Sequence, residues 1–396
     1  SAFIFMRLFG VKATIGIIAA VNISISLIIY FLFKPPLKAR LPYLETPSNK
    51  KSKPLQSSEI FILSSFAFSG LIALVYQVAW TRILSLLLGS SVYAFSLILS
   101  VFILGLALGT VTASRFLDKL SDLIKGYGLI QMIIGFSSLT ILPVFGYIPF
   151  VNRWIYENWS QQFEFMQGAN FLIIFGLLIV PTFFMGTQFP IVIKILAKKL
   201  ETVGQNVGKI YAFNTIGAII GSFLAGFVLV PTLGLQVTIL SAVFFNVLLG
   251  ILLLVLGTSI SFNWKIYVLP GVFTLCVVIA NSIAPWDKSV ISSGSFMPYR
   301  IGDLREAELK KNKILYFKEG MHTTVTTELS TSGNIFLRVN GKTDASLALD
   351  MRTQLLSGYL PMLFHTNPKS ALVIGQGSGI TLGAVEQFPV NKINLV

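Results

Sequence analysis

Residues 83–114 read ILSLLLGSSVYAFSLILSVFILGLALGTVTAS and contain no charged side chain. A second stretch, 210–264, is equally free of charge. A helix of about 20 mostly apolar residues crosses the hydrocarbon core of a bilayer. A helix on the surface of a soluble protein keeps a polar face, which neither stretch can supply. These two stretches therefore predict membrane-spanning helices.

The overall composition agrees with this prediction. Hydrophobic residues make up 54% of the 396 residues, charged residues only 12%, and the mean hydropathy is +0.78. The net charge of +14 is concentrated in short segments between apolar runs, as in cytoplasmic loops, so we predict no nucleic-acid partner. The single cysteine, Cys276, lies in an apolar run, and no Cys/His cluster indicates a metal site.

Eight apolar stretches are candidate spans, and the segments between them differ in charge. Three basic segments, 34–59, 114–125 and 194–209, are separated by even numbers of spans and so fall on one face, which the positive-inside rule assigns to the cytoplasm. Segment 150–167 carries two glutamates and several aromatics and is expected on the outside. The candidate spans are 13–33, 60–88, 91–113, 127–149, 169–193, 210–231, 235–257 and 266–284.

An internal repeat suggests how the spans are grouped. GVKAT at 10–14, followed by Asn22, matches GLQVT at 234–238, followed by Asn246, at an offset of 224 residues. We therefore interpret 1–33 as the last helix of a preceding membrane repeat, 34–59 as a basic cytoplasmic linker, 60–257 as a six-helix membrane unit and 258–284 as a connecting apolar segment. Six-helix halves joined by a basic linker are typical of major-facilitator-like transporters.

The composition changes after Pro285, where charged residues return. We expect a linker over 285–313, a β-hairpin subdomain over 314–348 with strands at 314–318, 322–329 and 335–339, and the start of a Rossmann-like nucleotide-binding domain over 349–396. In that last segment a helix at 349–364 precedes a buried strand at 371–374, the glycine turn GQGSG at 375–379, and a helix at 380–387. Glycines after such a strand let a ligand approach the backbone. A structural glycine turn is the alternative, and the spacing suits an adenosyl sulfonium better than NAD.

Residues 316–396 resemble the spermidine synthase (polyamine aminopropyltransferase) family. The resemblance rests on VNGKTDAS at 339–346, on Asp350, Thr353 and Gln354, and on LVIGQGSG at 372–379. The helical part is similar to the branch of that family fused to a major-facilitator-like membrane domain, through GLIALVYQVAWTR at 70–82, PTFFMG at 181–186 and YAFNTIGA at 211–218. The fold class expected is a polytopic α-helical membrane domain, then a small β-sheet, then the truncated start of a Rossmann-like α/β domain.

The resemblance implies transfer of an aminopropyl group from decarboxylated S-adenosylmethionine to an amine such as putrescine, without a metal. It places Gly375, Gly377 and Gly379 at the cofactor. Asp344 and Asp350 are candidates for an acidic amine pocket, or else a solvated turn and a helix N-terminal acid. The ribose-binding and proton-accepting acids are expected beyond Val396, so we predict that these 396 residues alone are inactive.

Within the predicted spans, Arg82 is the only full charge, and Gln77 lies five residues before it. A charged residue in a membrane is a candidate functional site because leaving it unpaired is costly, although snorkelling to the interface is an equal alternative. Pro181, Gly186 and Pro190 suggest a broken helix. The GxxxG pairs at 105–109 and 217–221 predict close helix packing.

Two other functions stay open. The protein could be a transporter-like membrane protein whose Rossmann domain senses a ligand, or a methyltransferase that uses S-adenosylmethionine. We expect an integral protein of a bacterial inner membrane. Counting spans from a cytoplasmic linker places the C-terminal domain outside if 266–284 crosses the membrane, whereas supply of an adenosyl cofactor favours the cytoplasmic side.

Overall fold

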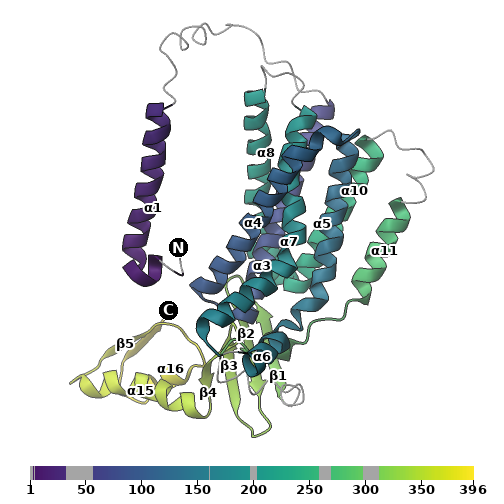
Figure 1. The fold of residues 1–396 in the computed structure, drawn as a ribbon. Helices are drawn as coiled ribbons and strands as arrows, with labels where there is room; N and C mark the ends of the chain where they lie inside the picture. The colour runs from purple at the N-terminus through teal and green to yellow at the C-terminus, as the bar shows by residue number, and fades with distance from the viewer. Residues whose placement is uncertain are drawn as a thin grey trace. The chain divides into compact units, whose positions relative to one another are not determined.

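The computed structural model describes residue 3 and residues 5–32, 57–159, 161–196, 203–257, 269–297 and 312–396 (Figure 1). The chain divides into two compact units, Ser1–Ile62 and Leu63–Val396. Most of the predicted linker 34–59, part of the connecting segment 258–284 and part of the linker 285–313 lie outside the described residues.

The first unit contains helix α1 (Phe5–Leu32), which is long and apolar enough to cross a membrane. The helix is interrupted at Gly10, where φ is 74° and ψ is 173°. Gly234, the repeat partner of Gly10, has almost the same backbone conformation, with φ 82° and ψ 168°. In each copy the threonine four residues later, Thr14 or Thr238, donates its hydroxyl to the glycine carbonyl at 2.7 Å. The sequence repeat therefore has a matching local structure, and glycine is required because both positions have positive φ.

The second unit is dominated by long helices that run side by side (Figure 1). Among the described residues of the whole chain, seven helices are long and apolar enough to cross a membrane, α1 included. The helices from α3 onward are α3 (Ser57–Leu88), α4 (Val92–Phe116), α5 (Leu123–Phe145), α6 (Ile148–Asn158), α7 (Phe163–Leu196), α8 (Val203–Phe223), α9 (Val230–Leu233), α10 (Leu235–Gly257), α11 (Leu269–Ser282) and α12 (Lys288–Ile291). A short 3₁₀ turn, η1 (Leu117–Lys119), follows α4, and a π-helical turn, η3 (Leu224–Leu229), joins α8 to α9.

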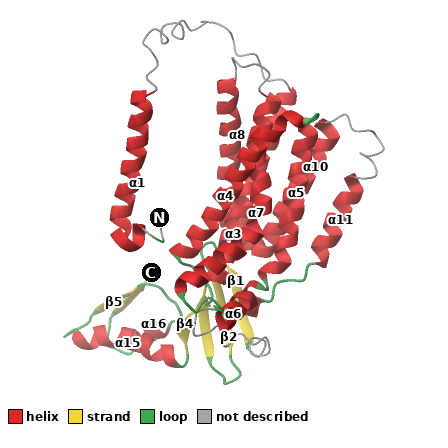
Figure 2. Cartoon of the chain, viewed as in Figure 1, coloured by secondary structure: helices red, strands yellow, loops and turns green. Residues whose placement is uncertain are grey.

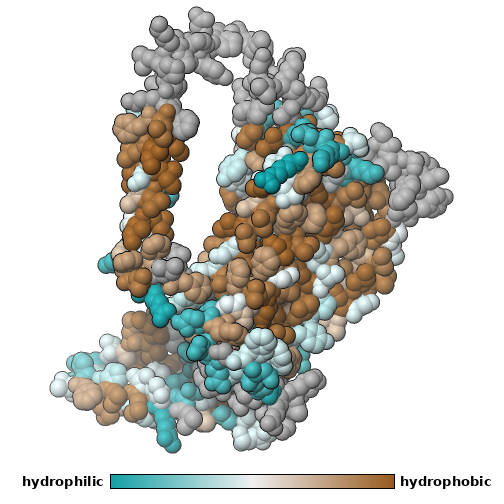
Figure 3. All heavy atoms as spheres, viewed as in Figure 1, coloured by the Kyte–Doolittle hydropathy of each residue, from teal (hydrophilic) through white to brown (hydrophobic). Residues whose placement is uncertain are grey.

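These helices correspond to the predicted spans, with two differences. In the eighth candidate, 266–284, the described residues form the 14-residue helix α11, which is shorter than the length that spans a bilayer. The break predicted around Pro181, Gly186 and Pro190 is wrong, because α7 continues through all three residues. Figure 3 shows hydrophobic residues over the visible sides of the helices and hydrophilic residues gathered toward their ends.

Glycines bring the helices into close contact in two pairs. A side chain at Gly105 or Gly109 of α4 would overlap Thr182 or Phe183 of α7. A side chain at Gly217 or Gly221 of α8 would likewise overlap the α3 backbone, at Ala67 and Leu71. The packing role predicted for both GxxxG pairs is confirmed, because only glycine lets the backbones approach this closely.

The strands lie in the C-terminal part of the chain (Figure 2). An antiparallel sheet has the order β1 (Lys313–Glu319), β2 (Thr324–Leu329), β3 (Ile335–Val339) and β4 (Lys342–Ser346). Strand β4 was not predicted, because its sequence KTDAS is polar and short. The turn predicted at Asn340 and Gly341 is confirmed: both residues have positive φ, as the two-residue loop of a tight hairpin requires.

The more buried face of this sheet is unexpectedly polar. Thr324, Thr326 and Glu328 of β2 are buried, and so are Phe336 and Arg338 of β3. The other apolar residues of β3, Ile335, Leu337 and Val339, are only half-buried. Arg338 donates to the Glu328 carboxylate at 3.0 Å and to the Ser292 carbonyl at 3.2 Å. Mutual pairing makes the burial of these two charges tolerable.

A small α/β unit follows the sheet. Helix α15 (Leu349–Phe364) precedes strand β5 (Ser370–Val373), helix α16 (Ile380–Glu386) and strand β6 (Lys392–Leu395), and β5 pairs with β6 in parallel. Its core contains Met362, Val373 and Val385. The predicted helix–strand–turn–helix order is confirmed, and the parallel strand after α16 completes a βαβ arrangement.

Candidate functional site

The glycine turn lies between β5 and α16 and has an unusual backbone. Gly375, Gly377 and Gly379 all have positive φ, of 84°, 52° and 80°. Other L-residues rarely adopt this conformation, so the three glycines are required by the turn itself. A Cβ built at any of the three would meet no atom within 4 Å, so the space beside the turn is open. The turn thus leaves room for a ligand to reach its backbone.

Gln354 of α15 connects the glycine turn to the sheet. Its side-chain oxygen accepts a hydrogen bond from the Ser378 hydroxyl at 2.7 Å, and its side-chain nitrogen donates to the Asp344 carbonyl at 3.0 Å. The Thr381 hydroxyl donates to the Gln354 backbone carbonyl at 3.0 Å. Our site prediction did not include Gln354, although its type is informative: a carboxamide supplies a donor and an acceptor on separate atoms, one for each of these two partners.

The two predicted carboxylates occupy different places. Asp344, on β4, lies next to the Gln354 contact, and its own carboxylate is 3.4 Å from the Lys342 ammonium in an exposed pair. Asp350 lies in the first turn of α15, where its backbone N–H donates to the Ser346 hydroxyl at 3.3 Å. The described contacts therefore associate Asp344, more than Asp350, with the glycine turn. The role of either residue in binding an amine stays a prediction.

Gln77 and Arg82, the two residues of the predicted membrane polar site, lie on the same helix, α3. Residues five apart on a helix are separated by about 140° around the axis, so the two side chains point in different directions. Arg82 instead donates to two carbonyls of the β1–β2 loop, those of Met321 at 2.5 Å and Gly320 at 3.0 Å. The arginine fastens this loop to the end of α3. A cavity of about 410 Å³ lies beside it, lined also by Ser90, Ser91 and His322.

Glu319, the last residue of β1, makes a second contact between the sheet and the helices. Its carboxylate accepts a hydrogen bond from the Leu235 backbone N–H at 2.9 Å, at the first residue of α10. Burial raises the pKa of the Glu319 carboxyl above its ordinary value, against the opposing effects of the Leu235 N–H and of the charges of Arg82 and Lys288. A carboxylate at a helix N-terminus satisfies an amide that the helix leaves free.

Comparison with known proteins gives distant relatives of one kind. The chain is 25% identical over 336 residues to a polyamine aminopropyltransferase of Leptospira interrogans, a match that covers 82% of this chain and 58% of the relative. It is 22% identical over 332 residues to polyamine aminopropyltransferase 2 of Aquifex aeolicus (83% and 59% covered), and 20% identical over 348 residues to a polyamine aminopropyltransferase of Oceanobacillus iheyensis (87% and 61%). No family model and no solved structure matches.

These matches extend beyond the sheet and the glycine turn. Each is several times longer than the segment 312–396, so each includes a large share of the apolar helices. The chain spans about three fifths of the length of these relatives. The three relatives are all named polyamine aminopropyltransferases, in agreement with the resemblance carried by the glycine-turn motif.

Proposed function

We propose that this chain belongs to a membrane-integrated, spermidine-synthase-like transferase. In this proposal the segment 349–396 is the start of a Rossmann-like domain, and the turn 375–379 binds decarboxylated S-adenosylmethionine. Gln354 holds the turn against β4 through Ser378, and Asp344 faces the amine acceptor, for which putrescine is the expected example.

The proposed reaction needs little covalent help from the protein. The amine nitrogen attacks the propyl carbon next to the sulfonium, so that a C–N bond forms as the C–S bond breaks and its electron pair returns to sulfur. The sulfonium becomes a neutral thioether nucleoside, and the amine releases one proton to a base. Because the sulfonium is already an activated electrophile, positioning the amine and accepting its proton are the main tasks.

The observation that carries this proposal is the glycine turn connected to β4 by Gln354. A glycine turn alone is a common structural device. Here three positive-φ glycines border open space, and a carboxamide brings the turn next to the strand that carries Asp344. The names of the three relatives agree with this arrangement.

The test compares two glycine substitutions in the whole protein, kept in its membrane. Gly379→Val forces a β-branched residue into positive φ, whereas Gly383→Ala lies in α16, has no positive φ and has free space for the new methyl group. With decarboxylated S-adenosylmethionine and putrescine, we expect thioether nucleoside from the natural protein and from Gly383→Ala, and at least tenfold less from Gly379→Val.

Absence of thioether with every amine acceptor tried would contradict the proposed transferase and favour the ligand-sensing transporter. Methyl transfer from S-adenosylmethionine, with decarboxylated S-adenosylmethionine acting only as a competitor, would instead identify a methyltransferase.

We further propose that the long apolar helices cross a membrane with the basic segments in the cytoplasm. Their outer surfaces support this, since large apolar side chains such as Leu172, Ile219 and Leu256 are more than half exposed. In water such a surface would aggregate, whereas hydrocarbon accommodates it.

The contacts of the C-terminal part support a position on the opposite side from the basic segments. Arg82 near the end of α3, Leu142 near the end of α5 and Leu235 at the start of α10 all contact residues 284–321. The other ends of α3 and α5 adjoin the basic segments 34–59 and 114–125. The two sequence expectations, cytoplasmic basic loops and a cytoplasmic C-terminal domain, therefore do not fit this structure together.

Cysteine labelling in intact cells tests this orientation. With Cys276 replaced by Ser, single cysteines are placed at Ser332, in the exposed β2–β3 turn, and at Ser121, in the basic segment 114–125. An impermeant maleimide should label Ser332→Cys in intact cells and Ser121→Cys only after permeabilisation. Labelling of both positions under the same condition would overturn the proposed orientation.

A further inference from the structure

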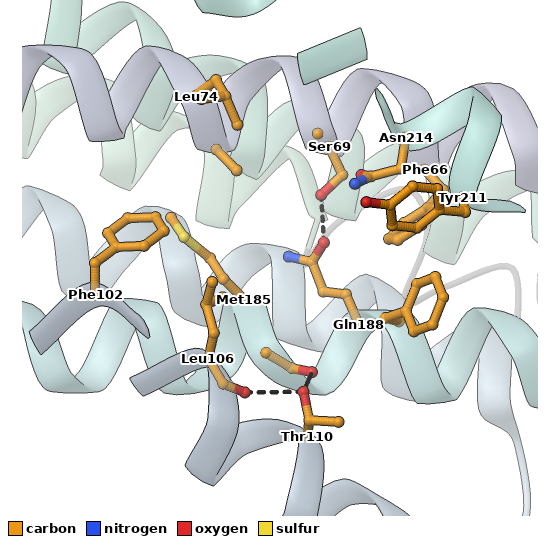
Figure 4. A pocket seen from close by; sticks show the side chains of 14 residues that line it. Phe66, Ser69, Leu74, Phe102, Leu106, Thr110, Met185, Gln188, Tyr211 and Asn214 are labelled. Atoms are coloured by element: carbon orange, nitrogen blue, oxygen red, sulfur yellow. Dashed lines mark hydrogen bonds between the residues drawn. The ribbon is translucent and has the colours of Figure 1, made fainter. Parts of the chain in front are cut away.

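A pocket of about 370 Å³ lies among helices α3, α4, α7 and α8, away from the glycine turn. It is bounded by the two glycine-packed helix pairs, α3 with α8 and α4 with α7. Most of its wall is apolar or aromatic, including Phe66, Phe102 and Phe189. The polar groups are few: Ser69, Thr110, Gln188, Tyr211 and Asn214 (Figure 4). This combination of an apolar wall with a few placed polar groups is typical of small-molecule sites.

Gln188 lies at the end of a chain of hydrogen bonds that begins at a backbone carbonyl. The Asn246 side-chain nitrogen donates to the Gln131 backbone carbonyl at 3.1 Å and to the Gln131 side-chain oxygen at 2.8 Å. The Gln131 side-chain nitrogen then donates to the Ser69 hydroxyl at 2.9 Å, and Ser69 in turn donates to the side-chain oxygen of Gln188. A reversed Asn246 would place its oxygen against the Gln131 backbone carbonyl, and a reversed Gln131 would place two amide nitrogens together. The Ser69 hydroxyl can donate or accept, and in this structure it donates to the Gln188 oxygen.

This chain leaves the Gln188 amide nitrogen as the group that faces the pocket. Gln188 is only 5% exposed, and no hydrogen bond from its nitrogen is found among the described residues. Figure 4 shows the nitrogen turned away from Ser69, toward the side of Met185. The nitrogen borders the pocket, so a ligand with a hydrogen-bond acceptor can pair with it.

Thr110, by contrast, has no donor left for a ligand. Pro190 lacks the N–H that would otherwise bond to the Gly186 carbonyl four residues earlier. The Thr110 hydroxyl reaches that carbonyl at 2.9 Å and its own Leu106 carbonyl at 2.8 Å. The side-chain donors that remain for a ligand are the carboxamides of Gln188 and Asn214 and the hydroxyl of Tyr211.

The pocket has no charged lining residue, which restricts the class of ligand. A polyamine or an adenosyl sulfonium is a cation and would enter this apolar space without a counter-charge, at a large desolvation cost. Of the species in the proposed reaction, only the thioether nucleoside is uncharged. Carboxamides pair well with the edge of a purine, and aromatic rings stack on its face.

We propose that this pocket binds a neutral, purine-containing thioether nucleoside, recognised by Gln188 and the aromatic wall. The inference rests on the proposed function for the identity of the ligand, and on the hydrogen-bond chain and the uncharged wall for the site itself. It gives the helical unit a binding role for a product of the transferase.

The test measures binding of radiolabelled 5′-methylthioadenosine to the whole protein in detergent. All variants are made on a Gly379→Val background, so that binding at the glycine turn does not contribute. We expect saturable binding that falls at least tenfold in Gln188→Leu. The matched control, Gln387→Leu on the surface of the C-terminal part, should bind as the background protein does.

A second pocket variant keeps the test decisive if Gln188→Leu does not fold. Leu74→Trp fills the pocket from α3 and leaves the hydrogen-bond chain intact, so it should also abolish binding while eluting as a monodisperse protein. Unchanged binding in both pocket variants, or displacement of the nucleoside by putrescine, would overturn the proposed site. If the natural protein forms thioether but does not bind the nucleoside at this pocket, this inference alone is refuted. If it binds the nucleoside through Gln188 but transfers nothing, the proposed function is refuted.

Discussion

The helical unit and the C-terminal sheet both bury polar side chains, but they satisfy them differently. In the helices, Gln131, Ser69, Gln188 and Asn246 form an uncharged chain of hydrogen bonds. In the sheet, Glu328 and Arg338 form a buried ion pair. In hydrocarbon, burial of a carboxamide costs less free energy than burial of a charge. In a sheet near water, a charged pair can be buried when its members bond to each other.

This difference also separates the two candidate sites. The glycine turn is open, and Gln354 connects it to β4, the strand that carries Asp344. The helical pocket is uncharged and suits a neutral molecule. Each site therefore has the same kind of polar groups as the region around it. Substitution of single residues in the hydrogen-bond chain and in the ion pair tests this comparison.

The largest effect is expected from Glu328→Ala. The substitution leaves Arg338 buried with its carboxylate partner removed, which typically costs about 3–5 kcal/mol. Chemical unfolding of the whole protein, followed by fluorescence, measures the loss. The double variant Glu328→Leu/Arg338→Met should recover most of it, because two apolar residues replace the pair. A double variant as unstable as the single one would show that the sheet does not depend on this pairing.

A smaller loss of stability is expected from Asn246→Leu, in the uncharged hydrogen-bond chain of the helices. It removes two hydrogen bonds to Gln131 and should cost about 1–2 kcal/mol, the range found for polar contacts between membrane helices. Asn281→Leu is the matched control, since the exposed Asn281 side chain bonds only the Val277 carbonyl of its own helix. Equal melting temperatures for the two variants would mean that the hydrogen bonds between Asn246 and Gln131 contribute nothing to the stability of the protein.

Thr110→Val should cost about 0.6 kcal/mol, the average for such hydrogen bonds in membranes. The loss depends on Pro190, which leaves the Gly186 carbonyl in need of a donor. In the Pro190→Ala background the restored N–H can bond to that carbonyl, so the same threonine substitution should have almost no effect. A double-mutant cycle measures this coupling, and strict additivity would exclude it.

The smallest effect is a pH dependence from Glu319. Its raised pKa means that the folded protein holds this proton more tightly than the unfolded chain does. The contribution to stability is therefore complete below the ordinary pKa of 4.5 and falls as pH rises toward the raised pKa. Melting temperatures over this range should decline more in the natural protein than in Glu319→Gln. Parallel curves for the two proteins would contradict the assignment.

Local patterns were sufficient for much of the fold. Charge-free apolar stretches predicted the long helices, paired glycines predicted their close packing, and Asn340 and Gly341 predicted the tight hairpin. Strand β4 was missed because its polar sequence resembles a loop. The helix break at Pro181 and Pro190 was wrong because a neighbouring helix supplies the donor that Pro190 lacks.

The candidate sites were only partly predictable. The three glycines are apparent in the sequence because positive φ requires that residue type. Gln354, Gln188 and the partners of Arg82 were missed. The single glutamines and asparagines in otherwise apolar helices were a usable signal for the helical pocket, since a buried carboxamide needs a hydrogen-bond partner.

The sequence by itself determined which segments are apolar helices, where the backbone turns with positive φ, and that a glycine turn follows a strand. These properties depend on composition and on residues near one another in the chain. Only the tertiary structure decided that Arg82 holds a loop 238 residues away, that Gln354 joins the glycine turn to β4, and that Gln188 directs a free donor into a pocket. A hydrogen bond depends on the distance and direction between two groups, and packing alone fixes these when the partners are far apart in sequence.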